Sequence, residues 1–370
     1  MKIGTEHEFT INGPGFEPLP VSDEIILSLS GGYGDEIPFS GSRLSKELQK
    51  TVLEWIPGSP STSSRDLEAS LYRSLVDFYR IFNDRYHLLG LGMHPTLTLS
   101  QTSVWNHGEQ EYFAAYDRLF DLRQHGWLNI QALQINLEYG CERDLVERFN
   151  RIRVLLPYLV AVTASSPFVE GRLTGSMDNR LLYYRENQRR IPLICDRIIP
   201  IPITGFESYL SRLEAIYAAL RAEGAGILCE EWVNSSGLIV RFSRPCLEIK
   251  ALDEQECLRS DFAVCAFVTS LLRAGDLGLE EDHDALLALN ETAIRSGTAD
   301  LKPELARLFR IANAYATPDE RRYLQVIGRR IEHGSLAELM RDRWRSSKDI
   351  GVLLHDMADS LRTNVPFMPD

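Results

Sequence analysis

The chain has 370 residues, of which 44% are hydrophobic and 25% are charged, a composition typical of a folded globular protein. This composition excludes disorder as the main state of the chain. Its 40 Lys and Arg against 52 Asp and Glu give a net charge of −12, the wrong sign for a general nucleic-acid binder. Binding of a nucleotide is still allowed, because cations gathered locally can hold phosphates.

Cysteine usage and hydropathy indicate the compartment. The six cysteines form no Cys-x-x-Cys pair and lie in apolar stretches, which indicates free thiols in a reducing environment. No apolar signal segment opens the sequence, and no apolar run approaches the ~20 residues that cross a bilayer. We therefore expect a cytoplasmic protein that binds neither nucleic acid nor membrane, and no oligomeric state is predicted.

The first elements of the chain are strands and a helix. Residues 2–11 alternate between apolar and polar side chains and end in turn residues, which predicts a strand. Residues 31–45 are rich in Gly and Ser and indicate a loop, and residues 51–56 predict a second strand. Apolar residues at steps of three and four then predict a helix over 67–82, opened by a capping signal from Ser63 to Asp66.

The rest of the chain mixes both element types and then becomes helical. Further strands are predicted at 88–95, 130–139, 227–234, 238–242 and 246–251, and further helices at 111–124, 145–159 and 209–222. From Asp261 the pattern is helical to the end, with a capping box at Thr317 and Glu320. We predict one α+β unit over 1–370, with a mixed catalytic core at 1–255 and a helical C-terminal part at 256–370.

Four of the predicted strands carry polar side chains on one face and apolar side chains on the other. The polar positions are Glu6 and Glu8, Glu54, Gln134 and Asn136, and Glu248 and Lys250. An antiparallel sheet with one solvated face would also explain each strand taken alone. Glutamate is a poor strand former and like charges repel, so its recurrence here favours a common role in binding cations.

Basic side chains accompany these glutamates. Arg241 and Arg244 precede Glu248, Lys250 follows it, and Arg180 lies in a polar loop. Mg²⁺ and Mn²⁺ prefer oxygen ligands and bridge to substrate phosphates, while Arg and Lys contact phosphate or carboxylate oxygens. The combination predicts nucleotide-dependent phosphoryl transfer. No Walker-type phosphate loop, Gly-x-Ser-x-Gly elbow or His-Glu-x-x-His pair occurs, which excludes the enzyme classes defined by those motifs.

A resemblance to a known family follows the same residues. The opening Ile3-Gly4-Thr5-Glu6-His7-Glu8 resembles the first strand of glutamate-cysteine ligases, especially those of the plant type. Similar segments follow in the family's order at 53–60, 89–95, 133–138, 165–171 and 246–253. Six collinear matches between residues 3 and 253 are far more specific than any one of them.

The resemblance implies a fold and a reaction. The fold is a curved antiparallel sheet of about six strands that forms a funnel, flanked by helices. In the reaction, ATP phosphorylates the γ-carboxylate of L-glutamate, and the amino group of L-cysteine displaces the phosphate from this acyl phosphate to form an amide. The implied cofactor beside ATP is Mg²⁺ or Mn²⁺, and the partners are these small molecules.

The resemblance also implies roles for individual residues. The metal ligands are Glu6, Glu8, Glu54 and Glu248; the residues on the substrate wall are Gln134 and Asn136, to which we add Arg244; and the groups that meet phosphates or the substrate carboxylate are Lys250, Arg180 and Arg241. Two features depart from the family pattern. Related bacterial ligases carry a His-x-His pair where this chain has Asn136 and Glu138, and Lys250 replaces an arginine, which removes the bidentate fork.

Two alternatives accompany this prediction. One is the same chemistry with a different amine or a peptide, because strands determine phosphoryl transfer whereas loops determine the acceptor. The other is a nucleotide- or metal-binding protein without catalytic turnover.

Overall fold

The computed structural model describes residues 1–368 and is built on one sheet of eight strands. The strands of this sheet are β1 (Ile3–Asn12), β2 (Glu36–Phe39), β3 (Ser42–Lys46), β4 (Val52–Pro57), β5 (His87–Leu89), β6 (Ala132–Glu138), β9 (Leu238–Arg241) and β10 (Cys246–Asp253). The order is β2-β3-β4-β1-β6-β10-β9, with β5 also paired to β1, and all neighbours are antiparallel. The predicted α+β class and antiparallel sheet are confirmed, with eight strands where about six were expected. A separate hairpin joins β7 (Phe168–Val169) and β8 (Arg172–Leu173).

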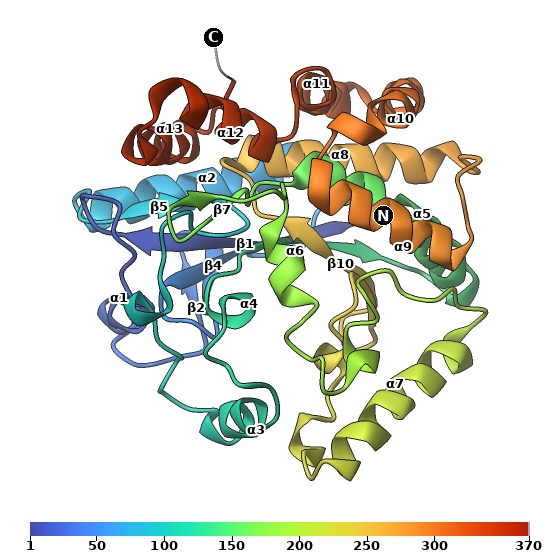
Figure 1. Cartoon of the computed structure of the whole chain (residues 1–370), viewed down its shortest axis with the longest axis horizontal. Helices are drawn as coiled ribbons and strands as arrows, with labels where there is room; N and C mark the ends of the chain where they lie inside the picture. Colours follow the sequence, from blue (N-terminus) through green and yellow to red (C-terminus); the bar gives the residue numbers. More distant parts are fainter. Residues whose placement is uncertain (369–370) are drawn as a thin grey trace.

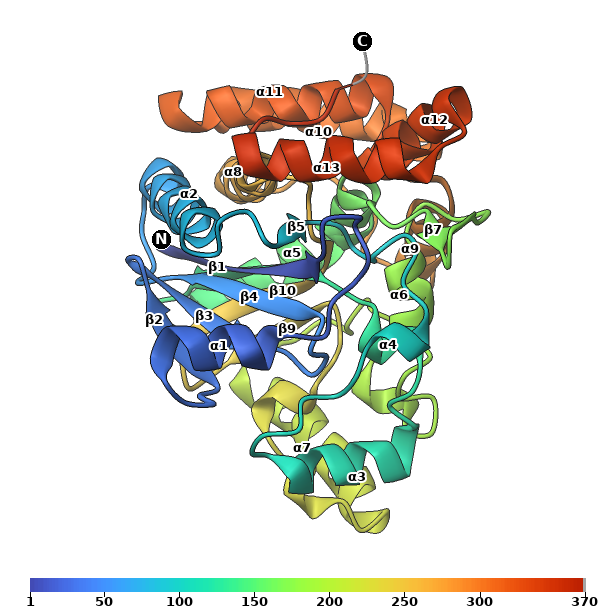
Figure 2. The same cartoon turned by 90° about the vertical axis from the view of Figure 1, so that its left-hand side faces the viewer.

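Helices lie on both sides of the sheet. They are α1 (Ser22–Ser30), α2 (Ser64–Ile81), α3 (Gln110–Phe120), α4 (His125–Leu128), α5 (Glu142–Thr163), α6 (Asn179–Tyr184), α7 (Phe206–Ala222), α8 (Leu258–Ala274), α9 (His283–Ser296), α10 (Lys302–Tyr315), α11 (Pro318–His333), α12 (Leu336–Ser347) and α13 (Ile350–Thr363). Figures 1 and 2 show α2, α5 and α8 against one face of the sheet, with α10 to α13 as an outer layer beyond α8. On the other side, α3 and α7 lie farthest from the sheet.

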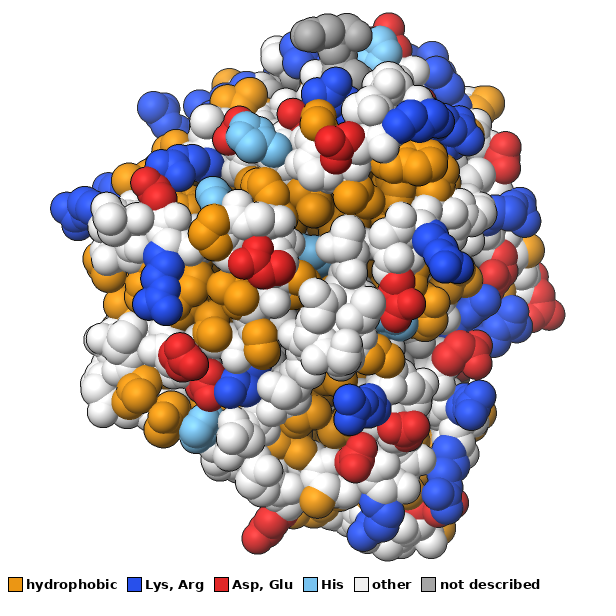
Figure 3. Space-filling view, turned by 60° about the vertical axis from the view of Figure 1, so that its left-hand side comes forward, with side chains coloured by type: hydrophobic (Ala, Val, Ile, Leu, Met, Phe, Trp, Pro, Cys, Tyr) orange, Lys and Arg blue, Asp and Glu red, His pale blue; other side chains and the backbone are white. Residues whose placement is uncertain are grey.

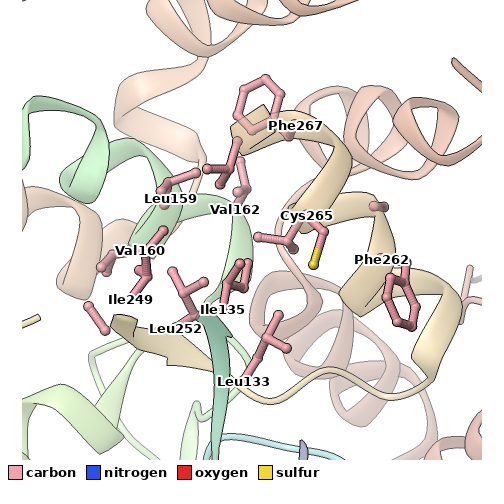
Figure 4. Packing of buried hydrophobic residues seen from close by; sticks show 14 of the residues in the cluster. Leu133, Ile135, Leu159, Val160, Val162, Ile249, Leu252, Phe262, Cys265 and Phe267 are labelled. Carbon is pink, nitrogen blue, oxygen red and sulfur yellow. The ribbon is translucent and has the colours of Figure 1, made fainter. Parts of the chain in front are cut away.

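The core lies between the sheet and the inner helices. Leu133 and Ile135 of β6 and Ile249 of β10 point toward α5 and α8, where side chains such as Val160 and Cys265 face them (Figure 4). All five are fully buried. Since side chains alternate along a strand, burying these residues on one face directs their neighbours to the opposite face.

The predicted helix signals are confirmed. The Ser63 hydroxyl accepts a hydrogen bond from the Asp66 N–H at the start of α2, as an N-cap does. At the start of α11, Thr317 and Glu320 form a reciprocal capping box, with Pro318 at the first helical position.

Three of the predicted segments differ from the structure. The segment 31–45 contains β2 and β3 rather than a loop, joined by a tight turn in which Ser40 and Gly41 have positive φ. The segment 227–234 forms two short 3₁₀ turns instead of a strand, because Leu228 and Val233 pack with α3 and α7. The strand predicted at 88–95 ends at Leu89, since the chain then runs tightly against the end of β10.

The close approach of Gly92 to Asp253 of β10 explains why the strand ends at Leu89. A Cβ atom on Gly92 would lie 2.2 Å from the carboxyl carbon of Asp253, so only glycine permits this approach. The close contact lets the Gly92 N–H donate to the Ser165 hydroxyl, 2.7 Å away, beside Asp253. Gly92 therefore brings the loop after β5 to the edge of the polar face of the sheet.

The surface is of mixed character. Figure 3 shows acidic and basic side chains interspersed with apolar ones over the face that it presents. In the described part of the chain, no helix combines the length and apolar composition needed to cross a membrane.

Candidate active site

The polar face predicted from four strands is real, and it is buried rather than solvated. Glu8, Glu54 and Glu248 are only 7%, 5% and 1% exposed. Isolated carboxylates avoid such burial, because removing a charge from water costs several kcal/mol unless it is paired, protonated or bound to a cation. A solvated sheet face therefore does not explain these glutamates.

Three carboxylates form the centre of this face. Glu8 of β1 and Glu54 of β4 are directly opposed in the antiparallel register. Glu47, in the turn between β3 and β4, completes a group in which one carboxylate oxygen from each residue lies within 4.8 Å of the other two. Burial and the other acidic groups raise the pKa of Glu54 well above its ordinary value. Burial and the neighbouring Glu47 raise the pKa of Glu8 to about 8.

Glu6 joins the same group from the next position along the face of β1. The Glu54 carboxyl hydrogen-bonds to Glu6, which contributes to the raised pKa of Glu54. The Glu6 Oε1 atom also accepts from Asn136 Nδ2 and from Arg244 Nη1, each at 3.1 Å. Asn136 and Arg244 thus lie beside Glu6, as the sequence analysis expected of the wall of the site.

Gln134 and the backbone of β6 hold Glu8. The Gln134 Nε2 donates to Glu8 Oε1 at 3.0 Å, and the Ala132 N–H donates to Glu8 Oε2 at 2.9 Å. These two donors lower the pKa of Glu8 against the larger opposing effect of burial. Both oxygens of the Glu8 carboxylate therefore have a fixed direction.

Glu248 lies on the same face but contacts cations. Its Oε2 accepts from Arg241 Nη1 at 2.6 Å, and its Oε1 lies 3.6 Å from Lys250 Nζ. Arg241 also donates to Glu231 at 3.0 Å. The described geometry therefore gathers Glu6, Glu8 and Glu54 with Glu47, whereas Glu248 pairs with two of the predicted catalytic cations.

Arg180 is held by a carboxylate of β10. Its Nε donates to Asp253 Oδ1 at 2.7 Å, and Arg180 is only 1% exposed. Burial acts to lower the pKa of Arg180, but Asp253 and Asp178 outweigh it and raise the pKa. The Ser166 hydroxyl, 2.7 Å from Asp253 Oδ2, fixes that carboxylate in turn. The Ser-Pro segment of the chain thus has a structural purpose, which is to orient the carboxylate that holds Arg180.

Two cavities flank the acidic group, each of about 390 Å³. One is bordered by Glu8, Glu47, Gln134, Arg180 and Lys250, and we call it the Glu8 cavity. The other is bordered by Glu6, Asn136 and Arg244, and we call it the Glu6 cavity. Seven of the predicted site residues therefore line one or the other of these two cavities, whereas Glu54, Arg241 and Glu248 line neither.

Sequence reasoning missed Glu47. The pairing of Lys46 with Leu53 places Glu47 next to Val52 and diagonal to Glu54 on the same face. The spacing of Glu47 and Glu54 would have placed them side by side across a hairpin of β3 and β4. The prediction of a loop over 31–45 left this hairpin out.

The opposite face of β1 holds another group that the sequence did not indicate. His7 Nδ1 lies 3.1 Å from Asp261 Oδ2 of α8 and 3.5 Å from Glu254 Oε1. Glu254 Oε2 accepts the backbone N–H of Glu8 at 3.0 Å. Burial and Asp261 raise the pKa of Glu254 well above its ordinary value. This buried network anchors β1 to α8 directly behind the acidic group.

The acidic group has the chemistry of a divalent cation site. It offers several carboxylate oxygens from Glu8, Glu47 and Glu54 close together, which is the ligand type that Mg²⁺ and Mn²⁺ prefer. Without a cation, burial and, after it, the neighbouring carboxylates raise the pKa values of Glu8 and Glu54 and so favour their protonated forms. The residues therefore fit the metal that was expected from the sequence.

Comparisons with known proteins identify relatives of this chain. An uncharacterised protein of Archaeoglobus fulgidus is 45% identical over 369 residues, covering 99% of this chain and all of that protein. The chloroplastic glutamate–cysteine ligase of Nicotiana tabacum is 28% identical over 230 residues, covering 56% of this chain and 42% of the plant protein. This chain therefore matches less than half of the length of the plant relative.

Solved structures share the fold. The glutamate–cysteine ligase of Francisella tularensis, solved in complex with AMP, superposes with a TM-score of 0.66 at 13% identity, covering 98% of this chain and 89% of that one. A bifunctional glutathione synthetase from Pasteurella multocida gives a TM-score of 0.61 at 12% identity, covering 98% of this chain and 51% of the other.

The sequence profile of glutamate-cysteine ligase family 2 (GCS2) matches residues 2–355, nearly the whole chain. Together with the buried acidic face, this defines the class of protein as a carboxylate-amine ligase. The chain belongs to glutamate-cysteine ligase family 2.

Proposed function

We propose that the protein is an ATP- and divalent-cation-dependent ligase that joins the γ-carboxylate of L-glutamate to an amine. The observation that carries this proposal is the group of buried carboxylates between two cavities that also present cationic side chains. Family membership supports the ligase class, and the AMP complex of a structural relative supports use of an adenine nucleotide.

In the proposed reaction, an oxygen of the glutamate γ-carboxylate attacks the γ-phosphorus of ATP and ADP leaves. The neutral amine nitrogen then attacks the acyl carbon, the C–O bond to phosphate breaks and the nitrogen gives up one proton to the departing phosphate or to solvent, so that an amide and inorganic phosphate are formed. A carboxylate alone is a poor electrophile, so its phosphorylation supplies the leaving group. Every atom is accounted for by ATP, glutamate and the amine.

The proposed cation site consists of Glu6, Glu8, Glu47 and Glu54. A divalent cation held there would neutralise charge on the triphosphate and on the acyl phosphate. Glu248 stays a predicted metal ligand, and its ion pairs give it the further task of orienting Arg241 and Lys250.

The remaining side chains bind and orient the substrates. Arg180 and Lys250 border the Glu8 cavity, where we propose that they contact the α-carboxylate or the transferred phosphoryl group. Burial acts to lower the pKa of Lys250, but the nearby Glu248 outweighs it and raises the pKa, so the side chain stays charged. Gln134 and Asn136 keep Glu8 and Glu6 pointing toward the space between the two cavities.

The names of the plant relatives suggest cysteine as the amine, and a different amine or a peptide is the alternative. The test is a coupled assay with ATP, Mg²⁺ and glutamate, in which phosphate release is measured against a panel of amines and the product is identified by mass spectrometry. We expect amine-dependent phosphate release and a γ-glutamyl amide. Binding of ATP and Mg²⁺ by calorimetry without any product would instead support a non-catalytic nucleotide-binding protein.

A further inference from the structure

The Glu8 cavity has a charged floor and aromatic walls. Its floor carries Glu8, Gln134, Arg180 and Lys250. Its walls carry six aromatic side chains: Tyr112, Phe113 and Tyr116 of α3, Trp127 of α4, Tyr184 of α6, and Trp232 of a 3₁₀ turn. The walls therefore come from the layer around α3, away from the sheet that supplies the charged groups (Figure 2).

The two cavities differ in charge. The Glu6 cavity presents Lys2, Arg43 and Arg244 against Glu6 and Glu138, an excess of cations. The Glu8 cavity balances three cations, Lys46, Arg180 and Lys250, with three carboxylates, Glu8, Glu47 and Glu109. A triphosphate favours the side with excess positive charge, whereas a zwitterionic amino acid and an amine favour the balanced side. This assigns the nucleotide to the Glu6 cavity and the amino acid with its amine partner to the Glu8 cavity.

One polar atom of the aromatic wall lacks a partner among the described residues. The Trp127 Nε1–H is buried and has no acceptor there. The hydroxyl of Tyr116 borders the same cavity, and burial of this side chain raises its pKa. Buried polar groups normally find partners, so a buried N–H left without one at this cavity points to a ligand that supplies an acceptor.

We propose that the amine acceptor carries a phenol-sized aromatic group, which occupies the wall formed by Tyr112, Tyr116, Trp127 and Trp232. This inference rests on the proposed function, since it names the acceptor class of that reaction. The side chain of cysteine has one methylene and one thiol, which is too small to cover such a wall. A ring with a polar substituent covers the apolar surface and gives Tyr116 and Trp127 hydrogen-bond partners.

The first test compares amines in the phosphate-release assay with wild-type protein, ATP, Mg²⁺ and glutamate. Tyramine and tryptamine are the aromatic probes, and cysteine and ethylamine are the small ones. We expect kcat/KM for the better aromatic amine to exceed that for cysteine by about tenfold or more, because a pocket contact of this size discriminates at that level. A higher kcat/KM for cysteine would overturn the inference and leave the proposed ligase intact. Absence of product with all four amines and with the wider amine panel described above would instead refute the proposed function.

The second test uses Tyr116→Phe, which removes one hydroxyl and keeps the ring. We expect KM for tyramine to rise about fivefold or more, with KM for ATP unchanged. Tyr315→Phe, at a tyrosine 51% exposed on α10, is the matched control and should change neither value. If Trp232→Leu or Tyr116→Phe raised KM for ATP and left KM for tyramine unchanged, the aromatic wall would be the adenine site and the inference would be wrong.

Discussion

The two faces of the central sheet are made by the same strands and differ in almost every physical respect. Toward α5 and α8, Ile135 and Ile249 are buried in an apolar core. On the other face, Glu8 and Glu54 are nearly as buried but lie among other carboxylates with raised pKa values. The first face contributes to the free energy of folding, and the second opposes it in the absence of a cation. Burial of a side chain in this sheet therefore does not by itself show that the side chain stabilises the fold.

The largest expected effect tests the packed face. Ile135→Ala removes a fully buried side chain of β6 from this face and leaves a cavity, so we expect the free energy of unfolding to fall by about 2–5 kcal/mol. Urea denaturation followed by circular dichroism measures this loss. Leu210→Ala on α7, at a leucine 47% exposed, is the control and should stay within about 0.5 kcal/mol of wild type. Similar losses for both variants would contradict the assignment of the core to this face.

The second prediction concerns the acidic face, where a substitution is expected to lower activity without lowering stability. Glu54→Gln keeps the shape of the side chain and removes an ionisable carboxylate from the group with Glu8 and Glu47. Ligation should fall about hundredfold, because a cation ligand is lost. The melting temperature without metal should stay equal or rise, since a neutral amide, unlike a carboxylate, need not take up a proton to be buried here.

The control for this prediction is Glu332→Gln, whose side chain is 72% exposed on α11. It should change neither ligation nor the melting temperature. A metal-free Glu54→Gln protein that melts well below wild type would show that the acidic face stabilises the fold by itself, contrary to the comparison above.

The smallest effect is a dependence of stability on pH. Glu8 has a pKa of about 8 in the folded chain against an ordinary value of 4.5, so folding favours its protonated form. The resulting stabilisation is complete below about pH 4.5 and is lost as the pH rises through about 8. The melting temperature of the metal-free protein should therefore decline over this range.

Differential scanning fluorimetry of wild type and Glu8→Gln measures this decline. The Glu8→Gln profile should be flatter, because the substituted side chain does not ionise. Added Mg²⁺ should raise the wild-type melting temperature most at the alkaline end, where the carboxylates are ionised. Parallel profiles for the two proteins would contradict the raised pKa of Glu8.

Much of the sheet was predictable because alternation is a local property. The pattern of Glu6 and Glu8, of Glu54, and of Gln134 and Asn136 can be read within each strand, and the structure places all five side chains on one face of the sheet, with the glutamates buried. The helix signals at 63–66 and 317–320 are local in the same sense. Short-range periodicity therefore located the strands that carry the site.

The rest depended on contacts between distant residues. Glu47 joins the site only through the β3–β4 pairing, and Asp253 meets Arg180 across 73 positions. The aromatic wall combines α3 with Trp232, which lies more than a hundred residues later. No periodicity within one segment encodes such pairings, because they are decided by how the layers pack. For the same reason, Leu228 and Val233 were predicted in a strand when they belong to the core beside α3 and α7.

The central place of β1 has a consequence for the synthesis of this protein. Strand β1 precedes the other strands of this sheet in the chain, yet it lies between β4 and β6, and its Glu6 contacts Arg244, which is made 238 positions later. Until residues near 250 have emerged, β6 lacks its neighbour β10, and the nascent chain carries a row of glutamates with few of their cationic counterparts. Closure of such long loops is slow. We therefore expect the nascent chain to acquire its affinity for divalent ions only late in translation, when the last strands are added to the sheet.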